Sequence, residues 1–212
     1  MARSGVEVVR LEPTRRELDD AAVIAARAFH HDPFFEFLSP RPLLRSRGLA
    51  IYWRSILAGL GGEDRLLAAR DAGGRLTGIA AWVAPGAYPQ PAPVQARQAL
   101  GALRALVPRP PALVRGSKYL LAIDKVHPKE HLWYLELLVV DPSMQRSGIG
   151  GRLQAEVMAE ADEDGLDCYL ETQNSDNLPY YARFGYEVAD ELHPVRSGPP
   201  LWTMRRKARR HA

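Results

Sequence analysis

An apolar run that breaks through Asp-Pro into a glycine-rich turn is the feature that most constrains the fold of this chain. Residues 131–140 carry mostly branched and aromatic side chains at both alternating positions, as in a central strand covered on both faces. The turn contains Gly148, Gly150 and Gly151, and apolar residues then recur at helical spacing as far as Gly165. A glycine there predicts the end of the helix. We therefore expect a buried strand, a tight turn and a helix in succession.

This turn has the composition of an anion-binding site. The backbone N–H groups of residues 146–151 would be unpaired donors in the first turn of a helix, where the helix dipole favours negative charge. Gly148 and Gly150 have no Cβ to keep a phosphate away. The turn lacks the Gly-Lys-Ser/Thr ending of a Walker loop, and its glycine spacing is not that of a dinucleotide fingerprint. A plain flexible loop is the alternative, which the flanking strand and helix disfavour.

The same segment resembles a known signature. Leu138, Val140, Gln145, Gly148 and Gly150 match the acetyl-CoA motif of the GCN5-related N-acetyltransferase (GNAT) superfamily, which reads Gln/Arg-x-x-Gly-x-Gly/Ala after a Leu-x-Val strand end.

A second stretch matches the family independently. Asn174, Tyr181, Gly185 and Tyr186 occupy the places of a family motif that ends in Asn-x6-Tyr-x3-Gly-aromatic. Residues 133–186 look most like the branch that resembles puromycin acetyltransferase. The recognisable motifs are confined to about residues 131–190, and the rest of the chain carries no signature.

The resemblance implies a fold and an acyl donor. The fold would be α/β (α+β), with a central, mostly antiparallel mixed sheet that splays at the acetyl-CoA site after Val140 and is flanked by helices. Backbone groups at the end of the strand would hold the pantetheine arm, and the glycine turn would hold the pyrophosphate. The cofactor-binding residues it implies are Leu138, Val139, Val140, Gln145, Arg146, Ser147, Gly148, Ile149, Gly150, Gly151, Asn174 and Tyr181. For Asn174, a helix cap is the alternative.

Acetyl transfer to an amine needs a base for the ammonium and an acid for the departing thiolate. The resemblance assigns the acid to Tyr181, whose ordinary pKa of about 10 makes it a proton donor at neutral pH; helix packing is the alternative. Glu136 is a carboxylate in an otherwise apolar strand. It must face a wet cleft, meet a partner or be protonated. Strict alternation places it on the same face as Tyr134, Leu138 and Val140. The choice of base between Glu136 and Glu171 stays open.

Contacts to the acceptor are predicted on two segments. Asp32, Phe34 and Phe35 follow the first predicted helix, where members of the family place the acceptor wall, although core packing is an alternative for the phenylalanines. Tyr134 and Glu171 are further candidates because they would lie on the neighbouring strands.

The remaining sequence predicts one domain over residues 1–212. A strand at 6–11 precedes a helix that Thr14 and Glu17 begin as a capping box. A short helical turn at 31–38 and a helix at 41–60 follow, then a hairpin with strands at 65–70 and 76–83. A stretch rich in proline from 85 to 111 surrounds a helix at 94–106, and another helix covers 112–126. The sequence thus predicts a helical insertion at about residues 85–128, which would either shape the substrate site or serve packing or dimerisation.

Composition excludes several classes of protein. Charged residues make up 25% and hydrophobic ones 46%, as in an ordinary globular protein. We expect no membrane span and no signal peptide, hence a cytoplasmic location. The single Cys168 is expected to be buried, and the six histidines show no metal-ligand spacing. The net charge is +3, and the basic run 205–211 is expected to be a solvated end rather than a nucleic-acid site.

The sequence hypothesis is an acetyl-CoA-dependent N-acetyltransferase that acts on a primary amine, expected to be that of a small molecule, by direct transfer in a ternary complex. Two alternatives remain open: a non-catalytic acyl-CoA-binding or sensor protein, and an enzyme that acetylates protein lysines or N-termini. A longer acyl group is also open. A homodimer is a family expectation.

Overall fold

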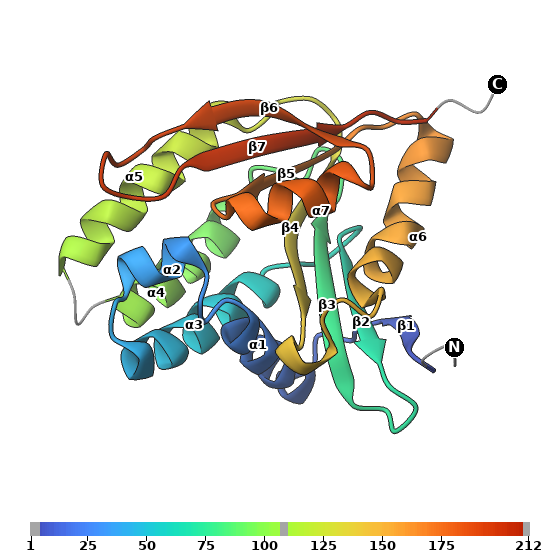
Figure 1. Cartoon of the computed structure of the whole chain (residues 1–212), viewed down its shortest axis with the longest axis horizontal. Helices are drawn as coiled ribbons and strands as arrows, with labels where there is room; N and C mark the ends of the chain where they lie inside the picture. The colour runs from blue at the N-terminus through green and yellow to red at the C-terminus, as the bar shows by residue number, and fades with distance from the viewer. Residues whose placement is uncertain (1–4, 107–109, 210–212) are drawn as a thin grey trace.

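The computed structural model describes residues 5–106 and 110–209. One mixed sheet of seven strands runs through the protein in the order β1-β2-β3-β4-β5-β7-β6 and has helices on both faces (Figure 1). Only the pair β4–β5 is parallel among the pairs of this sheet. The strands are β1 (Glu7–Arg10), β2 (Arg65–Arg70), β3 (Leu76–Val83), β4 (Trp133–Val140), β5 (Cys168–Thr172), β6 (Tyr186–Leu192) and β7 (Leu201–Arg206). The predicted fold class is confirmed.

Seven α-helices and two short 3₁₀ turns connect the strands within the described residues. They are α1 (Arg15–Ala28), α2 (Pro33–Leu38), α3 (Pro42–Leu57), α4 (Ala92–Leu106), α5 (Pro110–Val126), η1 (Pro142–Met144), α6 (Ile149–Asp164), η2 (Ser175–Asn177) and α7 (Leu178–Ala182). The predicted helices, including the two between residues 85 and 128, all exist and differ from their predicted bounds by a few residues at most. Such differences at helix ends are ordinary.

Local capping signals explain several of these boundaries. The Thr14 side chain accepts a hydrogen bond from the Glu17 N–H at the start of α1, as the capping box predicts. Gly165 ends α6 with a φ of 69°, in the left-handed region that glycine favours. The hairpin turn is held by the Asp71 carboxylate, which accepts from the N–H groups of Gly73 and Arg75.

Each face of the sheet has its own core. One cluster packs α1 and α3 against the sheet, and the other packs α6 against the opposite face. Strand β4 contributes to both clusters, which confirms the prediction of a central strand covered on both sides.

Strand β4 contains a bulge at Glu136. Across the pair with β3, Ala81 lies opposite Leu137 and Trp82 lies opposite Leu135, so Glu136 has no partner. Leu135 packs in the α6 cluster, whereas Leu137 packs in the α1–α3 cluster. The strict alternation that placed Glu136 on the same face as Leu138 and Val140 is therefore wrong. Because of the extra residue, odd-numbered residues face α6 before the bulge and even-numbered residues face it afterwards. Leu138 and Val140 therefore pack on the α6 side.

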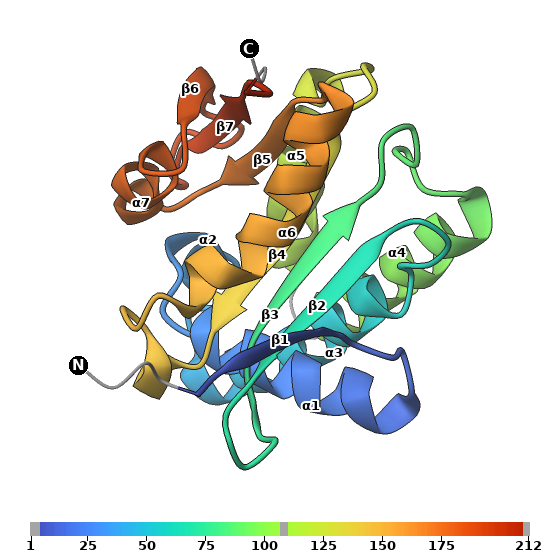
Figure 2. The same ribbon diagram turned by 90° about the vertical axis from the view of Figure 1, so that its right-hand side faces the viewer.

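Strands β4 and β5 separate soon after they meet. Their register has two pairs, Trp133 with Cys168 and Tyr134 with Tyr169. Figure 2 shows β5, β7 and β6 leaning away from the strands β1 to β4 beyond this point. The backbone groups of β4 that face β5 are consequently left without a strand partner from about Leu135 to Val140. This is the predicted splay.

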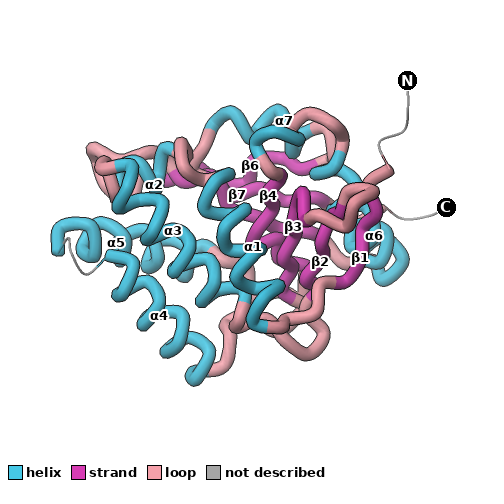
Figure 3. The backbone as a smooth tube through the Cα atoms, turned by 90° about the horizontal axis from the view of Figure 1, so that it is seen from below, coloured by secondary structure: helices cyan, strands magenta, loops and turns pink. Residues whose placement is uncertain are grey.

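Helices α4 and α5 lie on the α3 side of the molecule, away from α6 (Figure 3). Helix α4 sits close against α3 because small residues meet there. A Cβ added to Gly101 would collide with the Ser55 side chain, and one added to Gly48 would lie 3.1 Å from the Ala105 carbonyl oxygen. Helix α4 of the predicted insertion is thus docked on α3.

The start of the predicted basic tail is structural, which corrects the expectation of a solvated end. Arg205 and Arg206 belong to β7, and the Arg206 side chain is buried in a two-bonded pair with the Asp162 carboxylate at 2.6 and 2.8 Å. Isolated buried charges are too costly to leave unpaired, so α6 and β7 are tied together here. Residues 210 and 211 of the run lie outside the described residues.

Three expectations about absences and burial can be compared with the structure. Cys168 is fully buried, as predicted. No helix within the described ranges has the length and apolarity that a membrane span requires. Over the same ranges, no group of three or more histidine, cysteine or acidic side chains is arranged to hold a metal ion.

Candidate active site

A cavity of about 850 Å³ opens where β4 and β5 diverge. Its floor comes from these two strands, and its walls come from α2, α3, α4 and α5. It brings together both predicted catalytic residues and all five predicted acceptor-binding residues. These are Asp32, Phe34, Phe35, Tyr134, Glu136, Glu171 and Tyr181. These seven residues come from α2 with its N-cap, β4, β5 and α7, which are far apart in sequence, and they share one site.

Glu136 lies in the floor of the cavity, and no cationic side chain among the described residues pairs with it. The pKa of Glu136 is raised from 4.5 to about 7, first by burial and then by the charges of Glu171 and Asp64. Tyr52 of α3 is close enough that, after burial, the charge of Glu136 contributes to raising the pKa of the phenol. The bulge thus directs this side chain toward α3 and the cavity, consistent with bulges that re-aim a side chain beside active sites. A carboxylate with a pKa near 7 has the basicity that proton abstraction at neutral pH requires.

Glu171 differs from Glu136 because a histidine holds it. The His127 Nδ1 and Glu171 Oε1 atoms are 3.2 Å apart, and both side chains are almost completely buried. Tyr88 stacks on the His127 ring with centroids 3.6 Å apart, and Tyr134 meets its edge. Sequence analysis missed His127 and Tyr88. No motif marks them, because α5 and the loop after β3 bring them to β5 only in the folded chain.

Tyr181 lies at the cavity on the short helix α7. Burial raises the pKa of its phenol well above 10, with Tyr180 adding to the effect. The phenol is therefore fully protonated at neutral pH. It is positioned on the same cavity as Glu136, with one group suited to accept a proton and the other suited to donate one.

Asp32 lines the cavity, but helix α2 uses its carboxylate. The Asp32 Oδ1 accepts hydrogen bonds from the Phe34 and Phe35 N–H groups at 3.0 and 3.4 Å. Burial nevertheless raises the pKa of Asp32 to about 6. This cap fixes the start of α2, where Phe34 and Phe35 both line the cavity.

The glycine turn lies at the end of β4, beside the splay. Gly148 has a φ of 86° and caps α6, and Arg146 also adopts a positive φ of 60°. The Gln145 side chain donates to the Val140 carbonyl oxygen at 3.4 Å. Apart from its two chain neighbours, no heavy atom of the described residues lies within 4 Å of the place where a Cβ on Gly148 would stand. The residues 145–148 are thus largely exposed, whereas Ile149 is buried in the core.

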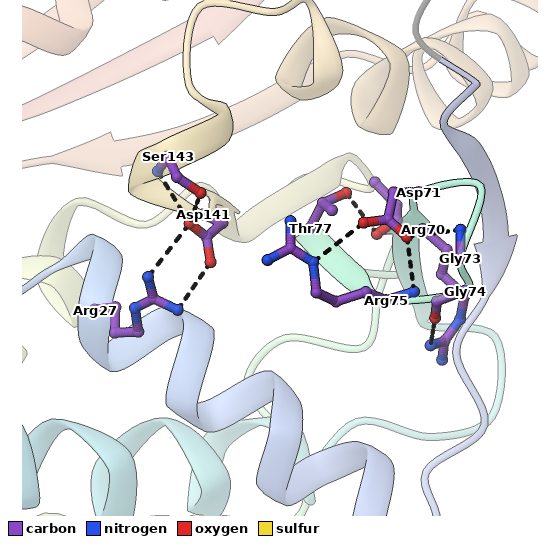
Figure 4. Close-up of polar contacts among 10 residues, drawn as sticks. Arg27, Arg70, Asp71, Gly73, Gly74, Arg75, Thr77, Asp141 and Ser143 are labelled. Atoms are coloured by element: carbon purple, nitrogen blue, oxygen red, sulfur yellow. Dashed lines mark hydrogen bonds and ion pairs between the residues drawn. The ribbon is translucent and has the colours of Figure 1, made fainter.

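Asp141 anchors this turn to helix α1. Figure 4 shows Arg27 and Ser143 both directed at the Asp141 carboxylate. Burial alone would raise the pKa of Asp141, but hydrogen bonds from Ser143 and the charge of Arg27 outweigh it, so the pKa lies below its ordinary value. The ionised carboxylate holds η1 in place and with it the approach to α6.

Gly150 has a packing role beside its predicted cofactor role. A Cβ at Gly150 would collide with the Tyr180 hydroxyl, and one at Gly151 would lie 3.0 Å from Phe184. The Tyr180 hydroxyl also accepts from the Gln154 side chain at 3.0 Å. These glycines therefore let α7 lie close against the first turn of α6.

We expect Gly150→Ala to destabilise the protein by about 1–3 kcal/mol, because the added methyl group overpacks this contact. Tyr180→Phe removes the hydroxyl with which the added methyl group clashes. The double variant should therefore lose less stability than the sum of the losses in the two single variants. Urea unfolding of the four proteins measures this coupling. Additive losses would contradict the assigned contact.

Asn174 lies elsewhere than the cavity. Its side chain accepts from the Asp176 N–H at 3.0 Å and caps η2, and it is not among the residues that line the cavity. Asn177 lines it instead and donates to the Thr172 hydroxyl at 3.0 Å. The cap was one of the two roles foreseen for Asn174. Its contact with the acyl donor stays a prediction.

Comparisons with known proteins agree with this geometry. Residues 98–186 match the family model described as the acetyltransferase (GNAT) family. An acetyltransferase of Agrobacterium fabrum is 35% identical over 75 residues, which are 34% of this chain and 55% of that protein. The match thus spans only about half of the length of this relative.

Solved structures support the fold over the whole chain. A protein of Corynebacterium glutamicum described as histone acetyltransferase HPA2 and related acetyltransferase has a TM-score of 0.67 at 21% identity, with 98% of this chain and 99% of that chain covered. Arylalkylamine N-acetyltransferase 2 of Aedes aegypti has a TM-score of 0.56 at 11% identity, with 96% and 99% covered. The two names imply different acceptors on one fold, so the fold alone does not identify an acceptor.

Proposed function

We propose that this chain is a GNAT-family acetyltransferase that moves an acetyl group from acetyl-CoA directly to the primary amine of a small molecule. The observation that carries the proposal is the shared cavity, where Glu136, Glu171 and Tyr181 meet at the divergence of β4 and β5. The base, the acid and the open strand edge then lie at one place.

The open edge of β4 fits the amide-bearing arm of CoA. Backbone groups from Leu138 to Val140 have no strand partner on the β5 side, so they are free to bind amides as a neighbouring strand would. The exposed turn at residues 145–148 and the first N–H groups of α6, a helix of 16 residues, suit a pyrophosphate. Acetyl-CoA supplies the activated thioester.

The protein's own residues would manage the protons. Glu136 accepts one proton from the ammonium and later releases it to solvent. The free amine nitrogen attacks the thioester carbonyl, and the carbon–sulfur bond breaks. Tyr181 donates its proton to the thiolate and regains one from the nitrogen, which becomes the amide nitrogen. The net products are the acetylated amine, CoA and one proton.

Calorimetric titration with acetyl-CoA, desulfo-CoA and NAD tests the donor site first. We expect micromolar binding of both CoA species and none of NAD. Release of free thiol that requires an added amine then tests the reaction. Binding without amine-dependent release would favour the acyl-CoA sensor, and no CoA binding would refute the proposal. Turnover with lysine peptides alone would favour a protein acceptor.

A further inference from the structure

The α4 and α5 walls of the cavity carry apolar side chains that stay partly exposed among the described residues. Leu100 and Leu103 of α4 line the cavity although 44% of each residue is exposed. Val114 and Leu120 of α5 line it from the other side and are exposed by 59% and 55%. Apolar surface in a concave site of this size is characteristic of a ligand pocket rather than of ordinary surface.

Aromatic rings continue this apolar surface toward the strands. The Phe34 and Tyr119 rings lie with centroids 4.8 Å apart, and Phe34 and Phe35 are 5.1 Å apart. Tyr119 is fixed because its hydroxyl donates to the Pro199 carbonyl oxygen at 2.5 Å. The ring faces are thus held in place by α2, α5 and the loop before β7, and they suit a planar or branched apolar group.

Charge in the cavity is confined to a few side chains. Arg45 is the one cation among the described lining residues, and its guanidinium donates to the Ser39 carbonyl and pairs with Glu36 at 3.2 Å. Asp32 is engaged by the start of α2, and Glu171 is engaged by His127. Glu136 is left as the acidic group of the floor without a cationic partner, which matches one ammonium group.

We infer that the acceptor is a monoamine whose single ammonium group is joined by a short chain to a bulky apolar body, aromatic or branched. The ammonium lies toward Glu136, and the body lies between α2, α3, α4 and α5. This inference rests on the proposed function. A polyamine or a peptide would place further charges or unpaired amides against apolar walls, which is costly.

Two measurements test the inference. The first is calorimetric binding of 4-phenylbutylamine, spermidine and the amide of N-acetyl-lysine to the protein without acetyl-CoA. We expect 4-phenylbutylamine to bind best, with a negative heat-capacity change as apolar surface is buried. The second is kcat/KM for a series of straight-chain amines with acetyl-CoA. It should rise about fourfold for each added methylene until the cavity is filled.

The variant Leu103→Asn isolates the wall. This variant should weaken the binding of 4-phenylbutylamine about tenfold and leave the binding of ethylamine unchanged, because only the longer amine reaches α4. Leu121→Asn is the matched control, since Leu121 is a leucine of α5 that is 69% exposed and does not line the cavity. Leu121→Asn should change the binding of neither amine.

The outcomes separate this inference from the proposed function. Acetyl transfer that prefers spermidine or the lysine amide would overturn the inference and leave the function standing. Binding of 4-phenylbutylamine that Leu103→Asn weakens, without any thiol release, would support the apolar amine site and overturn the function. Absence of both binding and turnover would overturn both.

Discussion

Glu136→Gln should lower kcat/KM by about 10²–10⁴-fold, the usual contribution of a general base. The wild-type rate should fall below about pH 7 as Glu136 takes up a proton, since the pKa of this carboxyl is raised to about 7. Deprotonation of the acceptor ammonium contributes the same pH dependence of kcat/KM to the wild type and to Glu136→Gln. The difference between the two pH profiles therefore isolates the titration of Glu136. A profile that keeps its full slope in the variant would exclude Glu136 as the base.

The same substitution should stabilise the protein at alkaline pH. A carboxyl whose pKa is raised on folding binds a proton more tightly in the folded state. Its contribution to the free energy of unfolding is therefore lost as the pH rises from about 4.5 to 7. For a pKa near 7, the loss approaches about 3 kcal/mol. Urea unfolding should therefore find Glu136→Gln more stable at about pH 8 and equal at about pH 4. Glu187→Gln, on the exposed edge strand β6, is the control. It should change neither kcat/KM nor the free energy of unfolding.

Tyr181→Phe should lower kcat by about 10²–10³-fold while the dissociation constant of acetyl-CoA changes little, because the ring remains and only the proton donor is lost. Stopped-flow thiol release and calorimetry measure the two quantities. Tyr186→Phe removes a hydroxyl from the neighbouring ring, 5.7 Å away and outside the cavity, and should keep normal turnover.

An acyl donor with a more acidic thiol distinguishes acid catalysis from packing. A thiolate that leaves without a proton needs no acid. With the acetyl thioester of an acidic aryl thiol as donor, the difference in kcat between Tyr181→Phe and wild type should therefore become smaller. An undiminished gap would assign Tyr181 a structural role, which was the alternative drawn from its place on a helix.

The parts of the fold that depend on neighbouring residues could be predicted from the sequence. The Thr14 capping box, the Asp71 hairpin and the Gly165 helix end all involve contacts within four residues. The glycine turn and the tyrosine of α7 were likewise found from short motifs. Each of these features is determined by backbone conformation and by side chains close in sequence.

The face of β4 on which Glu136 lies could not be predicted in this way. Strict alternation assigned it together with Leu138, and the bulge opposite Ala81 and Trp82 separated the two. A bulge depends on how two strands pair, which no periodic pattern in one strand reveals. The buried pair of Arg206 with Asp162 was missed for the same reason, because its partners lie 44 residues apart.

The sequence by itself determined the strand, the glycine turn and the helix that follow one another from residue 131 to residue 165, together with the candidate acid and base. Only the tertiary structure decided that His127 holds Glu171 while no described cationic side chain pairs with Glu136. It also decided that α4 and α5 line an apolar cavity above them. The physical reason is distance along the chain. Capping and turn formation act between neighbours, whereas the pKa of a carboxyl and the shape of a cavity depend on whichever distant residues the fold brings into contact.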